Sequence, residues 1–424
     1  MTTSHVAVSD DVQIRYATEE DLPGIVAVYG QSYPSPDFQA DWVSQRFRTN
    51  ERFGFADSVI LAEMAGQIVG MLIVMPLEAF TPGGGLVPMH GVSTLAVSPV
   101  HRGLGLGSRL MRWSLQKAHD NGVPIISGFP YEYRYYSRFG YAAVGRAEHY
   151  SFTPTILPLF PERRHVRLLN EDDIAEVQVC HETYHRQRGT LSPRRSETAW
   201  QTWWPWYRFQ AIGYPAEGPL EGLLLYEYKS ITDQRLQHEA VIRDFVALTP
   251  AAERGLYGYL AGMADQVRTI SMAVPVGDPL PMLWQEQRLA DSKSVRRGDY
   301  TTGETLVNLF LRITHVPAAM TGRTYNGQDG QLTLACSDPD LAANEQALGL
   351  TFTAGVATIG APVSAAPVLV CDIHTLAQIW SGSLAPSVAA RWGTLELSDE
   401  ALLPWLDAVF ATASPPFIPD YDTF

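Results

Sequence analysis

The sequence predicts an α/β protein of two related halves followed by an α+β domain. Three observations support this: a glycine-rich turn joins an apolar strand to a helix near residue 100, an early segment recurs in the middle of the chain, and basic residues become rare beyond residue 300. With 424 residues, the chain is long enough for about three domains of ~150 residues each. We place these domains at residues 1–158, 159–298 and 299–424.

The first domain should begin as a meander of strands. Apolar runs separated by turn residues predict three strands, and apolar residues at helical spacing then predict a helix and a further strand. These elements cover residues 59–63, 68–74, 92–97, 110–122 and 123–126.

A glycine-rich turn follows the third strand. Gly103, Gly105 and Gly107 lack side chains, so a pyrophosphate can approach the main chain, and the N–H groups that open the next helix point toward it with a favourable dipole. Arg102 adds a positive charge. The spacing fits neither G-x-G-x-x-G nor a P-loop, but it satisfies Arg/Gln-x-x-Gly-x-Gly/Ala. The turn predicts a phosphate-bearing cofactor, with an ordinary tight connection as the alternative.

An internal repeat links the first two domains. Residues 14–22 recur as 166–174, and in both copies a strand ends at a capping residue, Thr18 or Asn170, which three acidic residues follow. Two unrelated capped helices would be the alternative explanation. A second match favours duplication, because residues 246–250 echo the strand end at 95–99.

The second copy differs from the first at the turn itself. Tyr257 and Tyr259 stand where the first copy has two of its glycines, and their rings would fill the space that a pyrophosphate needs. We therefore expect the second domain to have lost cofactor binding and to serve as a structural support for the first domain.

The last third of the chain is strongly acidic. Residues 301–424 hold three arginines, Arg312, Arg323 and Arg391, against twelve carboxylates, a net charge of −9. Apolar runs predict an α+β domain with one sheet. The predicted strands cover 306–313, 332–336, 351–359 and 368–373, and the predicted helices cover 376–380 and 399–411.

Composition narrows the class of partner. The formal charge of −14 argues against nucleic acid and favours small cationic partners. No apolar run is long enough to span a bilayer, and the first residues lack a basic and then apolar signal segment, so we expect a cytoplasmic protein.

Cysteine usage indicates neither disulfides nor a metal. Cys180, Cys336 and Cys371 lie far apart in the sequence, without C-x-x-C and without a nearby histidine pair that we recognise as metal-binding. We expect them to serve in packing and expect no metal.

The turn from Arg102 to Gly107 resembles the acetyl-coenzyme A loop of the GCN5-related N-acetyltransferases (GNAT). Nearly the whole chain resembles the enhanced intracellular survival (Eis) acetyltransferases, most specifically through Tyr-Ser-Arg-Phe-Gly-Tyr at 136–141, Asp-Pro-Leu-Pro at 278–281 and a final phenylalanine. The resemblance implies two tandem GNAT folds, the second degenerate, then a sterol-carrier-protein-like domain, in a homohexamer. The family usually carries more arginine in the loop, where this chain has Gly103 and Leu104.

The resemblance also implies a set of site residues. Acetyl-coenzyme A would be the co-substrate, held by a strand, the turn and a loop. Its expected contacts are Leu95, Ala96, Val97, Arg102, Gly103, Leu104, Gly105, Leu106, Gly107, Ser108, Tyr131 and Glu132.

Two groups would carry the proton transfers. Tyr136 matches the family tyrosine that protonates the departing thiolate, and the terminal carboxylate of Phe424 would accept the amine proton, through water. A cationic amine would meet an acidic pocket beside them. Its expected contacts are Asp37, Trp42, Ser93, Thr94 and Asp422.

Two functions remain open at this point. The first is an N-acetyltransferase that acts on primary amines of cationic small molecules, such as aminoglycosides, polyamines or lysine-like side chains. The alternative is a non-catalytic acyl-coenzyme A sensor with a lipid-binding C-terminal domain.

Overall fold

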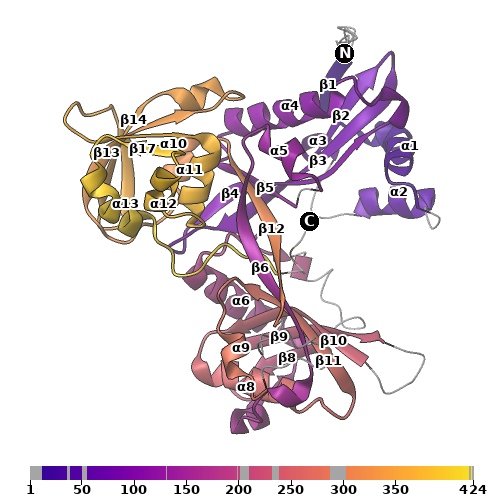
Figure 1. The fold of residues 1–424 in the computed structure, drawn as a ribbon. Coiled ribbons are helices and arrows are strands. Elements are labelled where there is room, and N and C mark those ends of the chain that lie inside the picture. The colour runs from indigo at the N-terminus through magenta and orange to yellow at the C-terminus, as the bar shows by residue number, and fades with distance from the viewer. Residues whose placement is uncertain are drawn as a thin grey trace, which may run out of the picture.

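The computed structural model describes residues 12–35, 39–49, 55–129, 131–197, 199–200, 210–231, 238–286, 302–419 and 422. These residues form one twelve-stranded sheet, which runs through the first two domains, and a separate five-stranded sheet in the third (Figure 1). Within these ranges, none of the helices combines the length and the apolar character needed to cross a bilayer.

The first domain contains every element predicted for it. Strands β2, β3 and β4 are longer than expected, and β5 has the expected length but begins two residues later. Helices lie on both faces of the meander, with α1 against β3 and β4 and with α4 against β2, β3 and β4. The elements are β1 (Val12–Tyr16), α1 (Leu22–Ser32), α2 (Ala40–Thr49), α3 (Phe55–Ser58), β2 (Val59–Met64), β3 (Gln67–Phe80), β4 (Leu86–Val97), α4 (Leu106–Asp120), β5 (Ile125–Gly128), α5 (Tyr133–Ser137) and β6 (Ala142–Phe152).

The second domain repeats this order. Its elements are β7 (Arg167–Leu168), α6 (Ile174–Arg188), β8 (Gln210–Tyr214), β9 (Gly222–Ser230), β10 (His238–Ala247), α8 (Pro250–Ala261), β11 (Val267–Pro275) and α9 (Leu280–Leu283).

Matching ion pairs confirm the duplication at the level of side chains. In the first copy Arg15 lies 2.7 Å from Asp21, and in the second Arg167 lies 2.5 Å from Asp173, so each strand is tied to the capped turn before its helix. The hydrogen bonds from Arg15 hold the pKa of Asp21 at about 2.

One strand lies where the sequence did not place it. The strand expected at 306–313 forms as β12 (Glu304–Ile313), but it pairs with β5 and β6 in the large sheet and not with the strands of the last domain. The order of that sheet is β1-β2-β3-β4-β5-β12-β6-β11-β10-β9-β8-β7. The C-terminal half of β12 is buried on both faces, with Leu311 in one core and Phe310 in another, and such a strand requires a central position.

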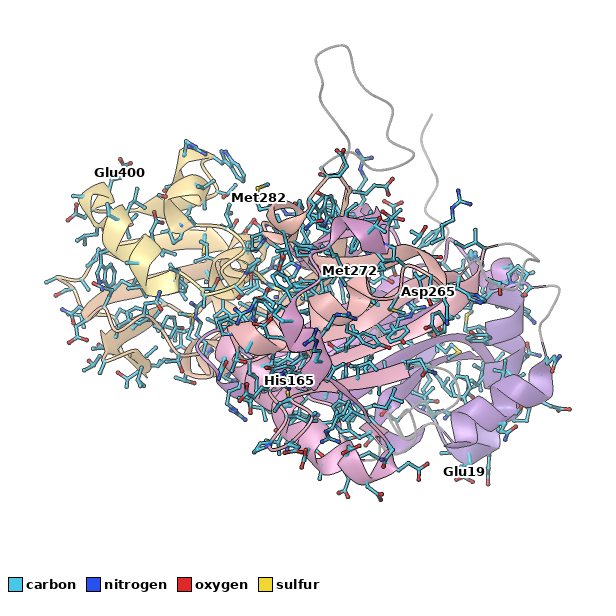
Figure 2. The ribbon with its side chains drawn as sticks, turned by 90° about the horizontal axis from the view of Figure 1, so that it is seen from below. Glu19, His165, Asp265, Met272, Met282 and Glu400 are labelled. Carbon is cyan, nitrogen blue, oxygen red and sulfur yellow. The ribbon has the colours of Figure 1, made fainter. Side chains whose placement is uncertain are left out.

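The third domain forms an α+β unit with one sheet of its own. Its strands are β13 (Gly330–Ser337), β14 (Leu348–Thr353), β15 (Val356–Gly360), β16 (Val368–Asp372) and β17 (Leu395–Leu397), and its helices are α10 (Val316–Thr321), α11 (Ile373–Ser381), α12 (Pro386–Arg391) and α13 (Leu403–Phe410). The single strand predicted over 351–359 is a hairpin, because Ala354 and Gly355 turn the chain at φ of +49° and +82°. Charged side chains such as Glu400 point outward at this end of the molecule (Figure 2).

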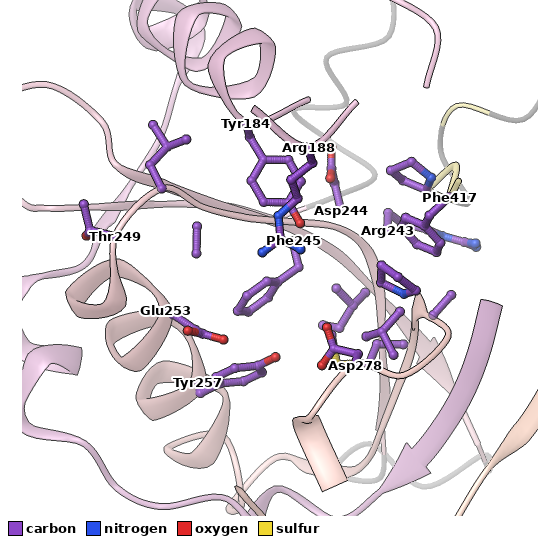
Figure 3. Close-up of a pocket in the computed structure, with 18 of the residues that line it drawn as sticks. Tyr184, Arg188, Arg243, Asp244, Phe245, Thr249, Glu253, Tyr257, Asp278 and Phe417 are labelled. Carbon is purple, nitrogen blue, oxygen red and sulfur yellow. The ribbon is translucent and has the colours of Figure 1, made fainter. Parts of the chain in front are cut away.

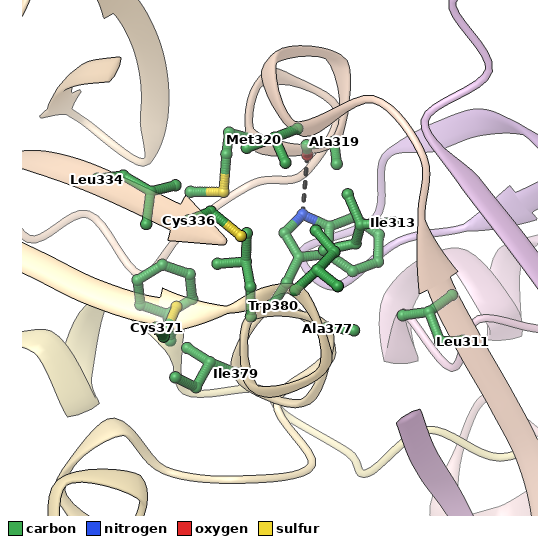
Figure 4. Close-up of a cluster of buried hydrophobic side chains, with 14 of the residues drawn as sticks. Leu311, Ile313, Ala319, Met320, Leu334, Cys336, Cys371, Ala377, Ile379 and Trp380 are labelled. Atoms are coloured by element: carbon green, nitrogen blue, oxygen red, sulfur yellow. Dashed lines mark hydrogen bonds between the residues drawn. The ribbon is translucent and has the colours of Figure 1, made fainter. Parts of the chain in front are cut away.

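A continuous core joins the third domain to the first. The buried Trp380 donates its indole N–H to the Ala319 carbonyl at 2.8 Å, beside Cys336 and Cys371 (Figure 4). These two free cysteines are far apart in sequence, but they are register partners on β13 and β16. All three cysteines of the chain are buried, which confirms their packing role. The same core includes Ile125 from β5.

Candidate functional site

The site begins where β4 and β5 part. Their parallel pairing runs from Met89 opposite Ile125 to Val92 opposite Gly128, where β5 ends while β4 continues to Val97. Immediately after Val92 the register against β3 shifts, so that two residues of β4 oppose one of β3. No strand among the described residues pairs with the edge of β4 beyond this point, which leaves backbone N–H groups available to an extended ligand.

The backbone of β4 presents alternate residues to that open edge. The N–H of Ser98 donates to the Val69 carbonyl of the neighbouring strand β3 at 2.9 Å. Since backbone groups of an antiparallel pair alternate in direction, Ala96 faces β3, whereas Leu95 and Val97 face the open edge. Of the three residues expected to pair with the cofactor, Leu95 and Val97 are therefore suitably directed and Ala96 is not.

Tyr33 is a site residue that the sequence analysis missed. Its hydroxyl donates to the Leu95 carbonyl at 2.9 Å, and the carbonyl of Val97 accepts from Ser32 at 3.2 Å. Both side chains come from the end of α1, so this helix anchors the open strand. The local signal was a tyrosine directly after the first helix, but nothing in the sequence connected it with residue 95.

The glycine turn has the conformation that glycine permits. Gly103 and Gly105 have φ of +83° and +75°, and a Cβ at either position would meet open space. The first hydrogen bond inside α4 runs from Arg109 N–H to the Gly105 carbonyl. The N–H groups of residues 106–108 therefore point out of the helix end, where they can bind an anion.

The other loop residues divide between packing and exposure. A Cβ at Gly107 would lie 2.6 Å from the Tyr135 hydroxyl, so this glycine makes room for a protein side chain and not for the cofactor alone. Leu106 is buried in the core, Leu104 packs against it, and Arg102 is exposed. The two leucine side chains are therefore engaged in packing, whereas Arg102 and the backbone N–H groups of 106–108 remain accessible.

Tyr136 lies at the mouth of the opening between β4 and β5. It shares a small cavity with Ser93, Phe129 and Phe310, so two of the predicted site residues are brought together. Its ring makes an edge contact with Tyr141, at 5.9 Å between centroids. Burial, with repulsion from Tyr135 and Tyr33, raises the pKa of Tyr136 to about 12. The hydroxyl therefore keeps its proton at neutral pH.

The remaining predicted contacts that the structure describes do not line the cavity beside Tyr136. Tyr131 is fully exposed. The Glu132 carboxylate accepts the Arg134 N–H at 3.3 Å and so caps α5, which is a structural role. Thr94 lies in the half-buried stretch of β4 just after Ser93.

Several candidates lie outside the described residues. Asp37 and Phe424 are among them, as is the side chain of Trp42, whose backbone belongs to α2. Their predicted roles stay predictions.

Asp422 is not a substrate contact. It is only 2% exposed, and Arg195 holds both its carboxylate oxygens at 2.7 and 3.1 Å while donating to Asp244 at 2.6 Å. A fully desolvated carboxylate paired in this way is closed to a ligand. Through Arg195, Asp422 of the C-terminal segment is linked to Asp244 of β10.

Two histidines complete this buried cluster. His181 and His185 stand one turn apart on α6, a spacing that can hold a metal, and we had expected no such pair. Their ring nitrogens and the Asp422 carboxylate lie within 4.8 Å of one another. Burial together with Arg195 lowers the pKa of His185 to about 3, so its ring is neutral. Arg195 already holds both oxygens of the Asp422 carboxylate. We therefore assign the cluster to tail anchoring.

The second copy of the strand-and-helix unit differs from the first in its groove and at its helix start. The groove between β10 and β11 contains Tyr257, stacked on Phe245 at 4.6 Å, as the sequence predicts. Tyr259 does not help to fill it, because its hydroxyl contacts Tyr226 at 2.8 Å elsewhere. At the start of α8, Thr249 caps the Ala252 N–H, which occupies a backbone group that the first copy leaves free.

Three family models match the chain in succession. Residues 13–144 match an acetyltransferase (GNAT) domain, residues 191–313 match a second acetyltransferase (GNAT) domain, and residues 316–419 match a sterol carrier protein domain. The second match extends through β12 and the third begins after it, in agreement with the place of β12 in the large sheet.

Known proteins resemble the chain over most of its length. An uncharacterized N-acetyltransferase of Streptomyces griseus is 27% identical over 84% of this chain and 87% of its own. The N-acetyltransferase Eis of Mycobacterium tuberculosis is 27% identical over 94% of this chain and 96% of its own. A crystal structure of a GCN5-related N-acetyltransferase from Anabaena variabilis has the same fold, with a TM-score of 0.82, 19% identity and coverage of 97% and 100%.

Proposed function

Because this chain is an Eis-like N-acetyltransferase with two GNAT domains and a sterol carrier protein domain, we propose that it acetylates a primary amine of a cationic small molecule, with acetyl-coenzyme A as donor. Aminoglycosides, polyamines and lysine-like side chains belong to this class. The observation that carries the proposal is the convergence of an open β4 edge, a free helix N-terminus and Tyr136 at one end of the sheet.

The residues present fit the donor. The open space above Gly103 and Gly105 suits a diphosphate, which the N–H groups of 106–108 would bind. The N–H groups of Leu95 and Val97 face the opening and would pair with the pantetheine arm. Acetyl-coenzyme A supplies its acetyl group as a thioester.

Tyr136 would act as the general acid. The amine nitrogen attacks the thioester carbonyl carbon, the carbon–sulfur bond breaks, and the hydroxyl proton passes to the departing thiolate. The resemblance assigns the opposite transfer to the Phe424 carboxylate, which would accept the proton lost by the amine. The Arg195–Asp422 pair fixes the segment from which that residue continues.

A screen of amines tests the proposal. Purified protein with acetyl-coenzyme A and a panel of polyamines, aminoglycosides and lysine peptides should release thiol, and mass spectrometry should find the acetylated amine. Co-purified lipid, with neither acetyl-coenzyme A binding nor turnover, would instead support the lipid-binding sensor.

Gly105→Trp should weaken acetyl-coenzyme A binding about tenfold or more. A side chain at this position enters the open space over the start of α4, where the diphosphate would contact the backbone. Calorimetric titration measures the effect. Gly122→Trp is the matched control, since Gly122 also has positive φ, +67°, and open space at its Cβ, but lies at the other end of α4. Equal loss in both variants would point to backbone strain.

Adding residues after Phe424 should lower kcat by about tenfold or more, because the extension converts the carboxylate to an amide that cannot accept a proton. Steady-state kinetics on the extended chain, with the same residues added at Met1 as control, measures the effect. An extended enzyme of normal kcat would remove Phe424 from the mechanism.

The hydroxyl of Tyr136 should stay protonated, and so able to act as a general acid, to a higher pH than that of an ordinary tyrosine. A general acid acts only while protonated, so the rate falls as pH rises through its pKa. That pKa is about 12 for Tyr136, compared with about 10 for an ordinary tyrosine. Once the amine substrate is deprotonated, the single-turnover rate should therefore show no decline up to about pH 10.5. A decline centred near pH ~10 would show that Tyr136 is unshifted or is not the acid.

A further inference from the structure

The second domain contains a cavity that the proposed acetyl transfer does not use. It lies in the groove between β10 and β11 and has a volume of about 210 Å³, many times the ~10–15 Å³ that one water requires. Helix α8 forms one wall, and Phe417 and Pro419 of the C-terminal segment contribute to another (Figure 3). The cavity is therefore large enough for a small organic molecule.

Two carboxylates face this cavity without a basic partner. Within the described part of the chain, Glu253 makes neither an ion pair nor a side-chain hydrogen bond, and Asp278 only accepts the backbone N–H of Leu280 at 2.9 Å. Arg188 also lines the cavity, with its guanidinium over the Tyr184 ring at 4.7 Å. It forms no ion pair with either of these two described carboxylates, although its positive charge favours the ionised form of both. The other charged groups of the wall, Arg243 and Asp244, are paired with Glu227 and Arg195. The unpaired groups therefore sum to a net negative charge.

Tyr257 provides a third polar group that faces the cavity. The residue is only 5% exposed, and its hydroxyl has no hydrogen-bond partner among the residues that the structure describes. Figure 3 shows that this hydroxyl points into the cavity toward Asp278, on the same side of α8 as the Glu253 carboxylate. Because this hydroxyl opens into the cavity and is not engaged by the protein, a ligand that forms a hydrogen bond with it gains affinity.

We infer that this groove, which no longer admits coenzyme A, binds a small organic cation with a primary ammonium group. An ammonium carries three N–H donors, and Glu253, Asp278 and the Tyr257 oxygen are three acceptors that face one space. The stacked rings of Phe245 and Tyr257 offer an apolar wall for the alkyl part of the molecule. The same carboxylates repel phosphates. The groove of the second domain would therefore bind a cation, whereas the corresponding site of the first domain would bind an anionic diphosphate.

Equilibrium dialysis of the full chain against radiolabelled 1,4-diaminobutane tests this inference. Glu253→Gln combined with Asp278→Asn keeps the side-chain shapes and removes both charges. At saturation this variant should bind one diamine fewer per chain than the wild type. Binding of the same diamine in the first domain would raise both totals but not their difference, so the result is independent of the proposed acetyl transfer.

Two further variants make the test specific. Tyr257→Phe should weaken the same binding event about tenfold by removing one hydrogen bond in a desolvated site. Glu217→Gln, at an exposed carboxylate of the same domain, should change nothing. Equal stoichiometry in the wild type and the double variant would overturn the inference, as would an equal loss in Glu217→Gln. If the double variant melts early, Tyr257→Phe decides the question by itself, and unchanged affinity there counts against the site.

Discussion

Tyr136→Phe should lower kcat about 100-fold, because a positioned general acid typically contributes at least this much. The substitution removes one hydroxyl and preserves the ring contacts with Tyr135 and Tyr141, so the fold should be unaffected. The KM for acetyl-coenzyme A should stay nearly constant, since the strand edge and the glycine turn that would hold it are unchanged. Steady-state kinetics with an amine found in the screen measures both quantities.

The control for this experiment lies on the same helix. Tyr133→Phe removes a hydroxyl that contacts His374 of the third domain at 3.3 Å, away from the cavity that Tyr136 lines. Its kcat should stay close to that of the wild type. If Tyr136→Phe raised KM while sparing kcat, the hydroxyl would serve in binding, and another group would have to protonate the thiolate.

Arg195→Met should destabilise the protein by about 3–5 kcal/mol, since it leaves two buried carboxylates without their cation. Asp244 and Asp422 are 3% and 2% exposed, and both bond directly to Arg195. Methionine keeps much of the volume beside Trp200, so the effect reports charge more than packing. Urea denaturation followed by fluorescence measures the change in the free energy of unfolding.

The neighbouring residue supplies a matched control for Arg195. Arg194 also pairs with two carboxylates, Glu78 and Glu182, but at the surface, where such pairs contribute at most about 1 kcal/mol. Arg194→Met should therefore be nearly neutral. Adding Asp244→Asn and Asp422→Asn to Arg195→Met should recover part of the loss, because the orphaned charges disappear. Failure to recover would mean that the arginine acts through packing.

Local signals of the first two domains could be predicted from the sequence because each depends on residues that are neighbours in the chain. Positive φ at Gly103 and Gly105 and the capped turns at Thr18 and Asn170 each involve a few consecutive residues. The carboxylate of Glu132, which the resemblance places among the cofactor contacts, caps α5, and no pattern in the sequence indicated this cap.

The sequence by itself determined the duplication, the glycine turn and the order of the elements, since strand, turn and cap preferences operate over short distances in the chain. Tyr136 as the candidate acid came from the family resemblance of residues 136–141. Only the tertiary structure decided that β12 enters the large sheet and that Asp422 is sealed against Arg195, 227 residues away. It also decided that Glu253, Tyr257 and Asp278 share one cavity. These outcomes depend on which distant segments come together to bury apolar surface and to neutralise charge, and no local pattern encodes that choice.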